Sequence, residues 1–320
     1  MSLFKKKLMV SYGALDILQK TNFKLKDDIK ITDIPVARYT FDQKPFQYNQ
    51  DLTDTMSCSC YGTGACLSSL VGNYFFTSDF DKIWQQEVDK GNASHIWGGY
   101  VVKMMDAWAK YWNANHEEKV IYFEVKMNNV ENVKMLLDRG YRIATGYNNH
   151  IGFNADWQND CVIDRNYDDS RDNEDWGEKT QGGHCISIAK TEEHKVKNCE
   201  YVIIDNYVDK KGREKNNIYG LRLDLLQELV NRGIVMNHGY VFMFDDDAKC
   251  VDRNVVERGI NKMFIGRTEK NKGGNGDVLY VNPLGQAFSY GTKRCKEEMY
   301  RNGVVLGVSE KDFKNFEIIQ

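Results

Sequence analysis

The sequence has little proline and almost no excess of charge. It contains 3 prolines in 320 residues, and 46 acidic against 43 basic residues give a net charge of −3. So little proline excludes a collagen-like chain and proline-rich linkers. The near-balance of charge provides no overall positive field, so we expect no nucleic-acid partner.

Long apolar runs are also missing. No run approaches the roughly 20 residues needed to cross a bilayer. Near the N-terminus, the apolar residues 8–10 are followed at once by Ser11, Tyr12 and Gly13, which is too short for the apolar core of a signal peptide. The sequence therefore predicts no signal peptide, no transmembrane segment and no membrane partner.

Cysteine is present but not in the patterns of a disulfide scaffold or a zinc site. The 8 cysteines are few for a chain of this length, and none forms a Cys-x-x-Cys pair. We expect reduced thiols, one of them reactive, and no metal. The acidic stretch 154–180 loosely resembles a calcium loop but lacks its central glycine and closing glutamate, so we interpret it as a solvated loop.

What the sequence does contain is enough apolar material for a sizeable core, with 42% hydrophobic and 12% aromatic residues. Apolar periodicity predicts helices over 57–76, 79–90, 98–113, 130–139 and 221–231. Strand-like patterns cover 121–125, 141–147, 184–189, 201–205 and 239–244. We expect an α+β fold with a helical half and an antiparallel sheet half.

Three consecutive acidic residues, 245–247, mark the expected domain boundary. They separate a domain over 1–247 from a small C-terminal α+β domain over 248–320, whose role the sequence does not indicate. Within that domain, 278–281 and 286–290 flank Asn282-Pro283-Leu284-Gly285 and predict a β-hairpin.

Cys58 stands at the start of the first expected helix. A cysteine there lies at the positive end of the helix dipole, which stabilises the thiolate that nucleophilic catalysis needs. The alternative is a small buried apolar residue, as most cysteines are. Cys60 and Cys66 are rival nucleophiles in the same segment.

His184 follows two glycines at the start of an expected strand, where its ring is placed to act as a general base. The alternative is a structural histidine. The next strand ends in Asp205 and Asn206, either of which supplies an acceptor that fixes the imidazole tautomer. Neighbouring strand residues face opposite ways, so only one of the two orients His184. Apolar periodicity does not choose between them.

Taken together, these segments resemble the papain-like cysteine peptidases, most closely the divergent forms of tailed bacteriophages. The resemblance spans roughly residues 45–245. It rests on Gln50, 54–58, Gly91-Asn92, the helix–glycine–strand over 130–146, 182–186, and the strand over 201–207. It implies a two-part papain-like fold with an N-terminal extension, and hydrolysis of a peptide or amide bond without metal or organic cofactor.

The resemblance also assigns roles. Cys58 falls on the nucleophile, His184 on the general base, and Gln50, with the backbone N–H of Cys58, on the oxyanion donors. Counting from the start of the strand favours Asn206 as the residue that orients His184, whereas the Asp-x-Tyr pattern of the phage forms favours Asp205. We lean to Asn206.

The sequence departs from this family at several positions. Leu52 occupies the place of the usual glutamine, Ser59 replaces the usual tryptophan, and Gly62 and Gly64 weaken the helix that presents the thiol. These departures favour an alternative, a degenerate papain-like fold that serves as a structural protein with other virion proteins as partners. A second alternative is an amidase or transferase acting on a cell-wall peptide, although no wall-binding repeat is present. A peptide or protein substrate, and a location in the host cytoplasm or the virion, are the expectations.

Overall fold

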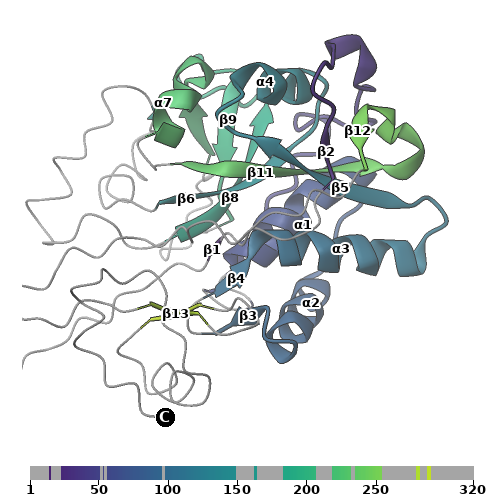
Figure 1. Cartoon of the computed structure of the whole chain (residues 1–320), viewed down its shortest axis with the longest axis vertical. Coiled ribbons are helices and arrows are strands. Elements are labelled where there is room, and N and C mark those ends of the chain that lie inside the picture. Colours follow the sequence, from purple (N-terminus) through teal and green to yellow (C-terminus); the bar gives the residue numbers. More distant parts are fainter. Residues whose placement is uncertain are drawn as a thin grey trace, which may run out of the picture.

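The computed structural model describes residues 14–15, 23–50, 53, 56–95, 98–148, 162–163, 183–206, 218–231, 235–253, 279–281 and 287–289. Helices and a mostly antiparallel sheet alternate along these residues, which confirms the α+β class (Figure 1). Among the described residues, no helix is both long and apolar enough to span a bilayer. The acidic stretch 154–180 lies outside the described residues apart from 162–163.

Four helices lie within about five residues of their predicted positions, whereas the helix expected over 221–231 forms only from Leu226, because residue 221 pairs in a strand and residues 223–225 form a 3-10 turn. The helices are α1 (Cys58–Val71), α2 (Thr77–Asp89), α3 (Val101–Asn115), α4 (Val130–Asp138) and α7 (Leu226–Asn231), with 3-10 turns η1 (Ile31–Asp33), η3 (Leu223–Leu225) and η4 (Asp245–Cys250). The helix expected from residue 98 begins three residues later, because residues 98–100 pair as a strand. In Figure 1, α1 and α3 lie below strands β5 and β11, and α4 and α7 lie above them.

The principal sheet has nine strands in the order β12-β2-β5-β11-β6-β8-β9-β10-β7. Their bounds are β2 (Lys24–Leu25), β5 (Val120–Lys126), β6 (Ile143–Asn148), β7 (Val162–Ile163), β8 (Gly183–Lys190), β9 (Tyr201–Ile204), β10 (Ile218–Leu221), β11 (Val235–Phe244) and β12 (Val251–Asp252). A second sheet joins β1 (Ala14–Leu15), β4 (Gly98–Tyr100) and β3 (Ala93–Ser94). The strands β6, β8 and β9 form an antiparallel meander, so the two strands expected to carry His184 and Asp205 are direct neighbours.

Helix α1 is buried on every side, from Cys58 through Leu70. Its two glycines follow from this packing. A Cβ at Gly62 would lie 2.8 Å from the sulfur of Cys185 on β8, and one at Gly64 would lie 2.6 Å from the ring of Trp108 on α3. The lower helix propensity of glycine is therefore offset by a closer approach of α1 to the sheet and to α3.

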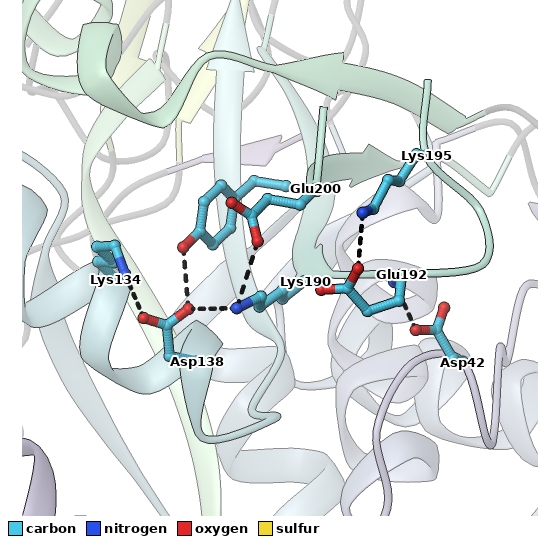
Figure 2. Close-up of polar contacts among 8 residues, drawn as sticks. Asp42, Lys134, Asp138, Lys190, Glu192, Lys195 and Glu200 are labelled. Atoms are coloured by element: carbon cyan, nitrogen blue, oxygen red, sulfur yellow. Dashed lines mark hydrogen bonds and ion pairs between the residues drawn. The ribbon is translucent and has the colours of Figure 1, made fainter. Parts of the chain in front are cut away.

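A polar cluster fastens the β8–β9 hairpin to α4. Asp138 accepts hydrogen bonds from Lys190 at 3.0 Å and from the hydroxyl of Tyr201 at 2.9 Å, and it also pairs with Lys134 (Figure 2). Lys190 pairs in addition with Glu200 at 3.3 Å. The hairpin that carries His184 near one end is thus anchored at its other end.

The sheet extends past the boundary expected after Asp247. That position lies inside η4, whose Ala248 and Cys250 are buried in the main core. Beyond it, β12 pairs with β2 in the principal sheet, with Val251 opposite Leu25. The first structural unit therefore continues at least to Asp252. Of the residues after 253, the structure describes β13 (Leu279–Val281) and β14 (Ala287–Ser289), which confirm the predicted hairpin.

Candidate active site

Cys58 is the first residue of α1, as the sequence predicts. Its N–H belongs to the first turn, where backbone donors have no partner within the helix. The residue is fully buried, at 0% exposure. The thiol therefore lies at the positive end of a helix in surroundings that exclude water.

His184, on β8, lies between Cys58 and Asp205. Its Nε2 is 2.8 Å from Oδ1 of Asp205, the residue that follows β9. On the other side lies Cys58, which together with Asp205 raises the pKa of His184. Both His184 and Asp205 are buried, at 1% and 0% exposure. Three residues far apart in the sequence thus influence one another in one buried group, with His184 and Asp205 in direct contact.

The pKa of His184 is raised to about 10 by these neighbours. Burial acts in the opposite direction and lowers the pKa, because it disfavours the charged imidazolium. The negative charge of Asp205 and the interaction with Cys58 outweigh burial. His184 is consequently an imidazolium at neutral pH in this structure.

The preference for Asn206 as the orienting residue is wrong in this geometry, and strand register gives the reason. Ile188 on β8 lies directly opposite Ile203 on β9, so these two share a face of the sheet. His184 is four residues before Ile188 and keeps that face, and Asp205 is two residues after Ile203 and keeps it too. Asn206 faces the other way.

Asn206 instead holds the segment that contains Gln50. Its side-chain Oδ1 accepts the N–H of Tyr48 at 3.2 Å, and its backbone carbonyl accepts the N–H of Gln50 at 2.9 Å. Gln47 donates from Nε2 to the carbonyl of Asp205 at 3.0 Å. Gln50 is itself fully buried. The structure thus places all five predicted site residues in two adjoining groups, with Cys58, His184 and Asp205 in one and Gln50 and Asn206 in the other.

The rival cysteines lie in different surroundings. Burial raises the pKa of Cys60 well above its ordinary value, and it raises that of Cys66 to about 12. Cys60 directs its thiol to the carbonyl of Phe80 at 3.7 Å. Cys185 on β8 is also buried, with its pKa raised well above the ordinary value. These thiols are therefore protonated at neutral pH and inert as nucleophiles.

Strand β4 runs close to Cys58. A Cβ added at Gly99 would lie 2.7 Å from Oγ of Ser59, the residue after Cys58. β1 pairs with β4, with Ala14 opposite Gly99, and β1 also contacts β6 and β8. The short sheet of β1, β4 and β3 therefore adjoins the start of α1.

The sequence matches no known protein family and no curated protein. Within the part of the chain that the structure describes, no group of three or more His, Cys, Asp or Glu side chains is arranged to hold a metal ion.

Two residues near the site were not predicted. Arg142, just before β6, is buried and donates to the carbonyl of Phe46 at 2.8 Å and to Oγ of Ser187 at 2.7 Å. Tyr48 bonds Oγ of Ser68 on α1 at 2.6 Å. Both belong to contacts of the irregular segment before α1, which has no periodicity from which they could have been found.

Proposed function

We propose that this chain is a thiol hydrolase of the papain-like type, which cleaves a peptide or amide bond with Cys58 as nucleophile. The observation that carries the proposal is the buried hydrogen bond of His184 with Asp205, next to a buried Cys58 that also raises the pKa of His184. A helix N-terminus bearing the thiol, facing an antiparallel sheet that bears the base, supports the papain-like arrangement. A peptide or protein segment is the proposed substrate.

The reaction begins with proton transfer within the site. His184 takes the thiol proton of Cys58, and the resulting imidazolium is stabilised by Asp205. The sulfur of Cys58 then attacks the carbonyl carbon, and the carbonyl oxygen becomes an oxyanion. The N–H of Cys58, free of any partner within the helix, and the side chain of Gln50 are the proposed donors to that oxygen.

The tetrahedral intermediate collapses when the C–N bond breaks. His184 donates its proton to the leaving amine, and the acyl group remains on Cys58 as a thioester. His184, now neutral, removes a proton from water, which attacks the thioester. The acid leaves, the sulfur departs as thiolate, and His184 again holds the proton.

Burial of the site sets a condition on access. Cys58 and Asp205 are at 0% exposure and His184 is at 1%, so neither substrate nor reagent contacts the sulfur until covering chain moves. Such a site also excludes water from the thiolate–imidazolium pair, which strengthens every charge interaction within it.

The experiment is competitive alkylation of the native protein with iodoacetamide at pH 6.5, followed by mass spectrometry of each cysteine peptide. Cys60 is the matched control, because it lies on the same helix, is equally buried and has no histidine partner among the described contacts. We expect Cys58 to react at least tenfold faster than Cys60 in the native protein, and we expect His184→Ala to remove that difference. Equal rates for the two thiols in the wild type would contradict the proposal and leave the structural role of a degenerate fold.

A further inference from the structure

Residues 46–50 form a strap between the end of β9 and helix α1, with Tyr48 and Gln50 buried. At the β9 end, Asn206 takes two hydrogen bonds from the strap, one from Tyr48 through its side chain and one from Gln50 through its backbone carbonyl. At the other end, the hydroxyl of Tyr48 bonds Ser68 of α1 and accepts the N–H of Phe75 at 3.3 Å. The strap therefore connects the strand end to the helix that carries the nucleophile.

Arg142 fixes the strap at its beginning. Its two terminal nitrogens bridge the carbonyl of Phe46 and the hydroxyl of Ser187 on β8. No carboxylate of the described residues pairs with Arg142, although the residue is only 3% exposed. A buried guanidinium engaged with a backbone carbonyl rather than a counter-ion serves to hold chain in place.

Asp205 and Asn206 therefore make separate contacts. Asp205 contacts the ring of His184, whereas the side chain of Asn206 hydrogen-bonds, among the described residues, to Tyr48 of the strap. Since the two residues face opposite sides of one strand end, a change in one leaves the first contacts of the other in place.

We propose that Asn206 is a positioning residue that sets the place of Gln50, and hence of the oxyanion donor, without acting on the proton held by His184. This inference rests on the proposed function. The proposal gives a reason for an asparagine at this position, because its Oδ1 accepts the N–H of Tyr48 as a backbone carbonyl would. The Nδ2 of Asn206 makes no hydrogen bond to the described residues, so only its oxygen carries the role.

The test compares two small probes that react with the same sulfur. Iodoacetamide alkylates a thiolate by displacement of iodide and creates no oxyanion, so its rate reports the Cys58–His184 pair. p-Nitrophenyl acetate acylates the sulfur through a tetrahedral oxyanion, so its rate also reports the donors. Both are measured at Cys58 in the full chain, from pH 5.5 to 8.5.

We expect Asn206→Ala to lower the acylation rate at least tenfold, while the alkylation rate and its pH profile change by less than about twofold. Asn206→Asp retains an oxygen to accept the Tyr48 N–H, and it should restore acylation to within a few-fold of wild type. In a Gln50→Ala background, Asn206→Ala should cause no further loss, because its effect passes through Gln50.

Three results would overturn the inference. An equal loss of alkylation and acylation in Asn206→Ala would show that Asn206 supports the Cys58–His184 pair or the stability of the whole fold. A full additional loss in the Gln50→Ala background would show that Asn206 does not act through Gln50. A wild-type protein whose Cys58 reacts with neither probe faster than Cys60 does would overturn the proposed function, and this inference with it. The melting temperature of each variant shows whether it is folded. If Asn206→Ala does not fold, the alkylation and acylation rates of Asn206→Asp are compared with those of the wild type instead.

Discussion

Asp205→Asn removes one negative charge beside His184 and keeps the shape of the side chain. Oδ1 of Asp205 lies 2.8 Å from Nε2 of His184 in a fully buried site. With the charge centres about 4 Å apart and an effective dielectric constant of about 20, the attraction is about 4 kcal/mol. That is equivalent to about three pH units in the protonation of a histidine. The pKa of His184, now about 10, should therefore fall to the ordinary histidine range or below it, because burial then acts with less opposition.

Two measurements follow from this magnitude. Alkylation of Cys58 by iodoacetamide at pH 6.5 should slow by on the order of a hundredfold in Asp205→Asn, since the thiolate–imidazolium form loses most of about 4 kcal/mol. Stability should also respond. A histidine whose pKa is raised on folding contributes stability that is fully present below its unfolded pKa of about 6.5 and is lost as the pH rises through the folded value of about 10.

Urea unfolding at pH 6, 8 and 10 therefore separates wild type from Asp205→Asn. The wild type should be the more stable of the two by several kcal/mol at pH 6, and the difference should narrow steadily toward pH 10. Asp205→Glu, which keeps the charge on a longer side chain, is the control for geometry. A variant Asp205→Asn that alkylates at the wild-type rate, or whose stability deficit does not depend on pH, would refute the charge argument and show that a neutral orienter suffices.

Two further predictions concern the support of the site. Gly62→Ala should destabilise the fold by about 1–3 kcal/mol in urea unfolding, although alanine favours the helix, because the added Cβ meets the sulfur of Cys185 at 2.8 Å. Shortening that neighbour in Gly62→Ala/Cys185→Ala should recover part of the loss, and an unchanged deficit would show that the contact is not its cause. Asp138→Asn should cost about 1–2 kcal/mol at pH 7, because Lys190 and Tyr201 lose their charged acceptor. The pKa of Asp138 is lowered by its hydrogen bonds, which outweigh burial, so this contribution is present above the unfolded carboxyl pKa and is lost as the pH falls below about 4. Persistence of the full difference between wild type and Asp138→Asn at pH 2 would contradict this account.

The sequence was sufficient for the elements with strong periodicity and for the residue that begins α1. Apolar spacing placed α1, α3 and α4 within a few residues of their observed positions, because helices of this length leave a clear periodic pattern of apolar residues in the sequence. The position of Cys58 followed from the start of such a helix. The region 98–100 was expected as helix because Trp97 and the apolar residues from Val101 onward share one helical stripe, whereas pairing with β1 and β3 makes it a strand.

Long-range pairing could not be predicted. The choice between Asp205 and Asn206 depends on the register of β9 against β8, and a shift of one residue would exchange their faces. Both faces of β9 are apolar and buried, so the sequence holds no alternation that would set the register. The role of Gly62 could not be predicted either, because it depends on the close approach of α1 to Cys185, which lies more than one hundred residues away in the sequence.

The burial of the site and the identity of its third residue are physically linked. In an exposed site, a neutral amide beside the imidazole is enough to fix its tautomer, because water helps to support the charge. Here burial is the largest influence on the pKa of His184 and acts against its protonation. A neutral acceptor would remove the strongest of the influences that oppose burial. The charge and hydrogen bond of Asp205, together with the influence of Cys58, outweigh burial, so a carboxylate at this position helps a fully buried histidine to keep its proton.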